Sequence, residues 1–194
     1  MKTIIERQRI YLNAKEEWQE WLERNHQSEQ SVWLVCNTMK SGLPSVSWSE
    51  LVDIALCFGW IDSTRRTVDK NSFMQLFSKR KSNSTWSRIN KEKVQRLIRN
   101  GLMMPAGYNV IRIAKQNGSW TILDQVEKLI IPEDMNEEFK NHSGSRDYFL
   151  SLSVSLKKMM LQWITMAKRP ETRKRRIEEI VINAGKRMKP ERFV

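Results

Sequence analysis

The stretch "RKSNSTWSRIN", residues 80–90, concentrates hydrogen-bond donors that suit an oxyanion. Its basic, hydroxyl and amide side chains can donate to phosphate or carboxylate oxygens, and its tryptophan can stack on a planar ring. A helix predicted to begin near Asn90 would add unpaired backbone N–H groups and the positive end of its dipole. With the nearby segment "GWIDSTRR", the stretch predicts an anion-binding site made of Trp60, Asp62, Arg80, Ser84, Trp86, Arg88 and Asn90.

A structural interpretation explains the same residues. Ser84 or Ser87 would cap a helix, Trp86 would fill a core position, and the basic side chains would face water. Both interpretations remain open at the level of the sequence.

Catalytic chemistry has one candidate residue. Asp62 follows an apolar Trp-Ile pair and precedes two arginines, so it can act as a general base with Arg80 as electrostatic partner, or form a structural ion pair. We therefore assign no catalytic residue and favour a non-catalytic protein, with an enzyme acting on a small anionic substrate as the alternative.

Metal and cofactor chemistry find no support in the residue spacing. The only histidines, His26 and His142, stand apart from any ligand-like cluster, and the chain has no glycine-rich phosphate loop. Cys36 and Cys57 lie in separate apolar segments, as buried thiols of a reducing compartment do. We predict no metal, no cofactor and a cytoplasmic location, because neither a signal-peptide pattern nor a membrane-spanning apolar run is present.

The formal charge of +12 is concentrated in two windows. Residues 79–99 contain eight basic residues and one acidic residue, and residues 168–189 contain nine basic and three acidic residues. Such fields attract anions, including nucleic acid. The partners expected are a small anionic ligand or, alternatively, nucleic acid bound by both windows; nothing in the sequence specifies an oligomeric state.

The elements that position these residues follow from periodicity and capping signals. The segment "SVWLVCNT" predicts a buried strand, "SWSELVDIALCFG" a helix capped by Ser47 and Glu50, and "WIDSTRRTVDKNSFMQLFSK" a hairpin. Asn13 is the predicted cap of an earlier helix. Near the C-terminus, "SVSLKKMMLQWITMAK" predicts a helix with Met159, Met160 and Trp163 on its apolar stripe, and the tail "KRMKPERFV" is expected to fray.

These elements predict an α+β protein. A mixed N-terminal unit, residues 1–130, with helices and a small sheet that includes a hairpin, precedes a helical C-terminal unit, residues 131–194.

Several of these blocks resemble those of one known family. The segments "ALCFGWIDSTRR", "RKSNSTWSRINKEKVQRLIRNGLMMPAGYNVI" and "AKQNGSW", followed by "WITMAKRPETRKRRIEEIV", are similar to the YdeI/OmpD-associated (OmdA, bacteriocin-protection) family over nearly the whole chain. The resemblance implies a link to bacteriocin or stress tolerance and supplies no reaction, cofactor or catalytic residue. We expect a cytoplasmic binder of an anionic ligand, with a biochemical activity that the resemblance does not specify.

Overall fold

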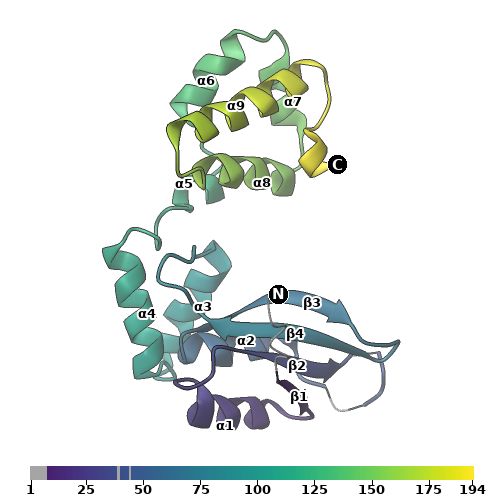
Figure 1. The fold of residues 1–194 in the computed structure, drawn as a ribbon, viewed down its shortest axis with the longest axis vertical. Coiled ribbons are helices and arrows are strands. Elements are labelled where there is room, and N and C mark those ends of the chain that lie inside the picture. The colour runs from purple at the N-terminus through teal and green to yellow at the C-terminus, as the bar shows by residue number, and fades with distance from the viewer. Residues whose placement is uncertain (1–7, 39, 44) are drawn as a thin grey trace, which may run out of the picture. The chain divides into compact units, whose positions relative to one another are not determined.

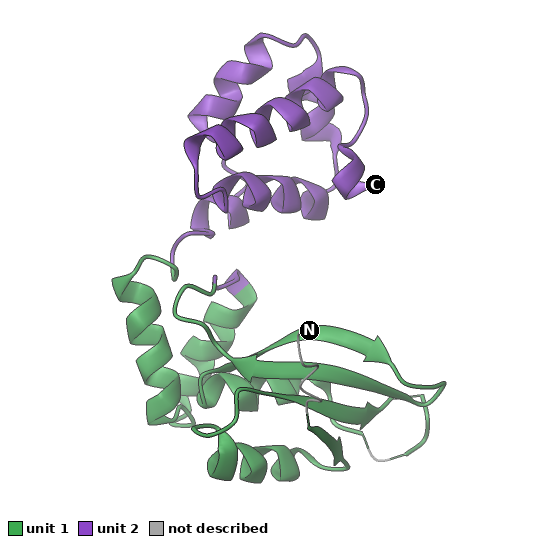
Figure 2. Cartoon of the chain, viewed as in Figure 1, with its two compact units in different colours: residues 1–84, 89–120 green, residues 85–88, 121–194 purple. Residues whose placement is uncertain are grey.

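The computed structural model describes residues 8–38, 40–43 and 45–194, which form two compact units (Figures 1 and 2). Unit 1 contains the described residues up to 84 together with 89–120, and unit 2 contains 85–88 together with 121–194. Every described strand lies in unit 1 and unit 2 is helical, so the predicted α+β class with a helical C-terminus is confirmed.

The elements of unit 1 are β1 (Arg9–Leu12), α1 (Lys15–Asn25), β2 (Ser31–Asn37), α2 (Trp48–Cys57), β3 (Trp60–Thr67), β4 (Ser72–Lys79), α3 (Arg88–Arg99, whose first residue is grouped with unit 2) and α4 (Pro105–Gln116). Those of unit 2 are α5 (Asp124–Glu127), α6 (Glu133–Lys140), α7 (Ser145–Ser151), α8 (Val154–Thr165), α9 (Pro170–Gly185) and a 3₁₀ turn, η1 (Glu191–Phe193).

The four strands form one mixed sheet in the order β1-β2-β4-β3. β1 runs parallel to β2, whereas β4 is antiparallel to both β2 and β3. The predicted hairpin is therefore confirmed as β3 and β4. A register shift between Asp62 and Arg65 interrupts this pair.

Aromatic side chains hold α1 against the sheet. Trp18 is fully buried, and its ring centroid lies 5.2 Å from that of Phe77 in β4 and 6.4 Å from that of Trp60 in β3. Its indole N–H donates to the carbonyl of Leu51 in α2 at 3.1 Å, which satisfies the polar end of a buried ring. The same side chain thus joins α1, α2 and the sheet.

The N-terminal cap predicted for α2 is confirmed, whereas the cap predicted for α1 is wrong. The Ser47 hydroxyl accepts from the Glu50 N–H at 3.3 Å, as predicted. Asn13 does not cap α1: its backbone N–H donates to Glu17, while Ala14 occupies the cap position without a side-chain hydrogen bond. Position 13 has the right residue type, but the helix starts one residue too late for its side chain to act as the cap.

A close backbone approach docks α4 against the end of α2. The N–H of Met104 donates to the carbonyl of Cys57 at 3.2 Å. Gly107, in the first turn of α4, lies so close to the carbonyls of Leu56 and Cys57 that a Cβ there would overlap them. A glycine is therefore required at this crossing.

Unit 2 surrounds a separate core, built from Met135, Phe139, Phe149, Met160, Leu161, Ile164, Ile177, Ile180 and Val181 together with smaller contributions from α5. Arg173 of α9 donates two hydrogen bonds to Asp134 of α6, at 2.6 and 2.9 Å. These bonds align the two helices across the same core.

The C-terminal tail was expected to fray, but its last turn, η1, packs on α8. Phe193 in η1 packs edge-on against Trp163 of α8, with ring centroids 5.6 Å apart. The guanidinium groups of Arg176 and Arg192 lie 5.0 and 5.3 Å from the centroid of the same indole. The contacts of Phe193 and Arg192 with Trp163 offset the conformational entropy that is lost when this charged segment packs on α8.

Candidate functional site

The structure brings Asp62 and Arg80 into one polar cluster of unit 1. One carboxylate oxygen of Asp62 accepts from Trp48 Nε1 at 3.1 Å and from Gln75 Nε2 at 3.4 Å. Burial raises the pKa of Asp62, and the Trp48 hydrogen bond and the charges of Arg80 and Lys93 act in the opposite direction. The cluster therefore holds an oriented carboxylate that is partly removed from water.

Arg80 is a buried member of this cluster rather than a surface cation. Its side chain is only 8% exposed, and its backbone N–H donates to the carbonyl of Gly59 at 3.0 Å. Burial lowers the pKa of Arg80 to about 10, although the nearby charge of Asp62 raises it. An arginine in this position remains charged at neutral pH and balances Asp62.

Trp60 and Trp86, the two predicted aromatic contacts, are both buried. Trp60 is fully buried beside the α1 aromatic residues, and its indole N–H donates to the His26 carbonyl at 3.3 Å. Trp86 is 2% exposed and belongs to unit 2.

The remaining predicted residues are divided between the two units. Half-buried Ser84 and Asn90 belong to unit 1, whereas Arg88 belongs to unit 2. The backbone N–H of Arg88 donates to a carboxylate oxygen of Glu127 at 3.2 Å, and Glu127 also pairs with Lys158 at 2.7 Å. The N–H of Arg88 thus binds a carboxylate of the protein itself.

A second basic site, which the sequence reading missed, surrounds Trp120 in unit 1. The ammonium groups of Lys91 in α3 and Lys115 in α4 lie 5.4 and 5.5 Å from the centroid of its ring. Two like charges close to one half-buried indole create a positive site with an aromatic component. We call these three residues the Trp120 site.

Local backbone geometry positions Trp120. Gly118 adopts a left-handed conformation, φ +79°, just after the last residue of α4. The chain therefore turns back, and the N–H of Trp120 donates to the carbonyl of Ala114 at 3.0 Å, which places the tryptophan beside the final turn of the helix. The signal in the sequence was the segment "KQNGSW", where a helix-ending glycine precedes a tryptophan by two residues.

Part of the stretch 80–90 lies against this site. The Ser82 carbonyl accepts from Asn117 Nδ2 at 2.7 Å and from Ser119 Oγ at 3.4 Å. The N–H of Ser84 closes a turn on the carbonyl of Lys81 at 3.0 Å. The loop 81–84 is thereby fixed to the loop that carries Trp120.

Many charges of the two basic windows serve internal contacts. Lys93 donates to Asp53 at 2.8 Å and Lys79 to the carbonyl of Gln27 at 2.6 Å, while Arg176 donates to the carbonyl of Trp163 at 2.5 Å. The exposed basic residues of the windows include Lys81, Arg88, Arg99, Lys168, Arg169, Lys174 and Arg175. Of the three internal contacts only that of Lys93 with Asp53 neutralises a charge, so most of the positive charge of the windows remains at the surface.

Neither histidine faces a metal-like cluster. His26 Nδ1 lies 2.7 Å from the Leu22 carbonyl, and His142 Nε2 lies 3.2 Å from Glu138. Within residues 8–38, 40–43 and 45–194, no group of three His, Cys, Asp or Glu side chains has the geometry of a metal site. The helices formed by these residues are also too short or too polar to cross a membrane.

Comparison with known families assigns both halves of the chain. Residues 10–110 match the family described as a domain of unknown function (DUF8412), and residues 128–186 match the family described as "Bacteriocin-protection, YdeI or OmpD-Associated". No curated protein and no solved structure shows significant similarity to the chain. The chain therefore belongs to the family of this domain of unknown function, whose model covers more than half of it, and its C-terminal part, residues 128–186, matches the YdeI/OmpD-associated family that the sequence blocks predicted.

Proposed function

We propose that this protein is a cytoplasmic, non-catalytic binding protein whose anionic ligand occupies the Trp120 site. The observation that carries the proposal is the convergence of the Lys91 and Lys115 ammonium groups on one indole. Through such binding the protein would contribute to the bacteriocin protection that the family description names, or to the stress tolerance expected from the family resemblance.

Electrostatics favours an anion at this position. Both ammonium groups lie within 5.5 Å of the centroid of the same ring, so both raise the positive potential beside this indole and attract an anion to it. Lys115 is exposed and Lys91 is half-buried, so one cation lies in water while the other is partly screened from it. The site can therefore take up an anion from solution without opening the core.

The indole narrows the class of ligand. A half-buried tryptophan stacks on planar rings, and stacking on an aromatic residue contributes about 1–3 kcal/mol per nucleic-acid base. A nucleotide would combine a ring for Trp120 with phosphates for Lys91 and Lys115. ATP is therefore the appropriate probe, with tripolyphosphate as the ring-free comparison.

Binding is favoured over catalysis because the candidates for acid–base or nucleophilic chemistry are not part of the Trp120 site. Asp62 and Arg80 form their own cluster, and burial raises the pKa of both cysteine thiols to about 11, where they are poor nucleophiles.

Isothermal titration calorimetry tests the proposal. ATP should bind the wild-type protein more tightly than tripolyphosphate, and Lys91→Ala with Lys115→Ala, or Trp120→Leu, should weaken ATP binding at least tenfold. Lys140→Ala with Lys174→Ala is the matched control, because both lysines pair with carboxylates on the surface of unit 2 and their loss changes the net charge by the same amount. Unaltered ATP binding in the double variant would overturn the proposed site.

Two further outcomes separate the alternatives. If only an oligothymidylate binds, with an affinity that falls steeply as salt increases, the ligand is nucleic acid rather than a small molecule. If the protein turns over ATP and Asp62→Asn abolishes this turnover, the protein is an enzyme rather than a binding protein.

A further inference from the structure

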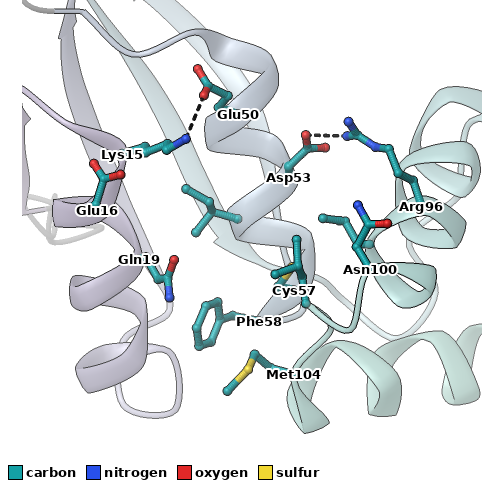
Figure 3. Close-up of a pocket in the computed structure, with 13 residues that line it drawn as sticks. Lys15, Glu16, Gln19, Glu50, Asp53, Cys57, Phe58, Arg96, Asn100 and Met104 are labelled. Atoms are coloured by element: carbon teal, nitrogen blue, oxygen red, sulfur yellow. Dashed lines mark hydrogen bonds and ion pairs between the residues drawn. The ribbon is translucent and has the colours of Figure 1, made fainter.

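A separate pocket in unit 1 lies between α1, α2 and α3 and has a volume of about 290 Å³ (Figure 3). Its apolar lining comes mainly from the end of α2 and from the segment that joins α3 to α4. The apolar and sulfur-containing residues are Ile54, Cys57, Phe58, Leu97, Leu102 and Met104. The pocket shares no residue with the Trp120 site.

Two carboxylates of α2 also line the pocket, with Glu50 directed toward Lys15 of α1 and Asp53 toward Arg96 of α3 (Figure 3). The two residues are three positions apart in the sequence. The Ser47 hydroxyl donates to Glu50 at 2.7 Å, and this hydrogen bond is the main reason that the pKa of Glu50 is lowered. Glu50 is thus an oriented and ionised group before any ligand arrives.

Asp53 is neutralised from the side of α3. It pairs with Lys93 at 2.8 Å and with Arg96 at 2.5 Å, and only 17% of its side chain is exposed. Asp53 therefore belongs to a fixed network, and the carboxylate available for exchange is Glu50.

Lys15 is the present partner of Glu50 and is readily displaced. Its ammonium nitrogen lies 3.4 Å from Glu50, and the two side chains are 52% and 46% exposed. Ion pairs between two exposed side chains contribute little to stability, so another amine can replace Lys15 at small cost.

The pocket is close to neutral within a chain that carries +12. Three carboxylates line it, from Glu16, Glu50 and Asp53, together with the cations Lys15 and Arg96, and Lys93 pairs with Asp53 beside them. Once Lys15 is displaced, the carboxylate of a ligand would be repelled by the ionised Glu50, whereas an ammonium group would pair with it.

We propose that this pocket binds a small amphipathic amine, whose ammonium group replaces Lys15 at Glu50 and whose apolar body lies on Ile54, Phe58 and Met104. The volume is at the lower end of ligand pockets, about 300–1,000 Å³, which suits a small molecule better than a protein helix. The proposal goes beyond the anion-binding function and does not depend on it.

Phenethylamine is the probe, and 3-phenylpropionate is the matched acid with the same ring. In ¹H–¹⁵N correlation spectra of the full chain, phenethylamine should produce saturable shifts of α1 and α2 amides, and 3-phenylpropionate should bind at least threefold more weakly. Equal binding of the two compounds, or no saturable shift with phenethylamine, would overturn the proposal.

Two variants of opposite effect complete the test. Glu50→Gln should weaken phenethylamine binding at least threefold, whereas Lys15→Ala should strengthen it, because the competing ammonium group is removed. Glu137→Gln in unit 2 is the control for the loss of one surface carboxylate and should leave binding unchanged. Weaker binding in Lys15→Ala would overturn the proposed displacement, whether or not Glu50→Gln folds normally.

Discussion

The indole Nε1 of Trp48 donates a hydrogen bond of 3.1 Å to Asp62 Oδ2, which connects the first turn of α2 to β3. The bond favours the ionised form of a carboxylate that burial otherwise disfavours. Trp48 is 44% exposed, so it contributes more to the orientation of Asp62 than to the core.

Replacement of Trp48 by phenylalanine should raise the pKa of Asp62 further. The variant removes the hydrogen bond to the ionised carboxylate and keeps most of the ring, so the protonated form becomes relatively more stable. Carboxyl ¹³C titration by NMR measures this pKa. Trp120→Phe, which changes an indole outside the Asp62 cluster, should leave it unchanged; an unchanged pKa in Trp48→Phe would show that Trp48 does not stabilise the charge.

Replacement of Asp62 by asparagine tests whether the cluster is structural. Arg80 would remain buried without a neighbouring carboxylate charge, which should cost about 3 kcal/mol of unfolding free energy. Arg80→Met combined with Asp62→Asn should recover part of this loss, since it removes the unbalanced charge. Urea unfolding followed by tryptophan fluorescence gives both values. A stable Asp62→Asn variant would contradict a structural ion pair.

Local signals in the sequence predicted local structure well. The Ser47–Glu50 cap and the hairpin of β3 and β4 each depend on residues a few positions apart. Hydrogen bonding and backbone conformation over such short spans are determined largely by the residues involved. The family blocks are likewise short runs of neighbouring residues, so they too could be recognised in the sequence.

Features that depend on distant residues were not predicted. β1 has only four residues and is stabilised by parallel pairing with β2 across α1, which no local pattern reveals. The Trp120 site joins Lys91 and Lys115, which lie on different helices. In α8 the buried face is rotated from the expected stripe: Met159 is 54% exposed, while Leu161 is buried. The rotation is set by packing against α5 and α9, a tertiary effect.

Gly107→Ala should destabilise unit 1 by about 3 kcal/mol. A Cβ at this position would lie 2.9 Å from the Leu56 carbonyl and would overlap that of Cys57, so α4 would have to move from the end of α2. Gly101→Ala is the control, with a left-handed φ of +68° and no atom within 4 Å of its Cβ, and should cost about 1 kcal/mol. Hydrogen exchange of the α4 amides measures the difference. Equal protection in both variants would exclude a steric role for Gly107.

Phe193→Ala should destabilise unit 2 by about 1 kcal/mol. The change removes the edge-on contact of Phe193 with Trp163 and loosens η1, which also carries Arg192. Faster hydrogen exchange at α8 amides would report the loss. Deletion of Val194, which is 95% exposed, provides the control and should have no effect. Similar exchange in Phe193→Ala and wild-type protein would mean that the tail does not stabilise α8.

The two cysteines should make the protein less stable in alkali. Burial raises the pKa of Cys36 and Cys57 from 9.0 to about 11, and the nearby charge of Asp53 contributes at Cys57. A thiol with a raised pKa in the folded state stabilises the protein fully below pH 9, and this contribution is lost as the pH rises towards 11. A Cys36→Ala, Cys57→Ala variant has no thiols to ionise, so its unfolding free energy does not fall for this reason. The difference in unfolding free energy by which the wild type exceeds this variant should therefore become smaller between pH 9 and 11. Urea unfolding across this range measures the difference, and a constant value would show that neither thiol resists ionisation in the folded protein.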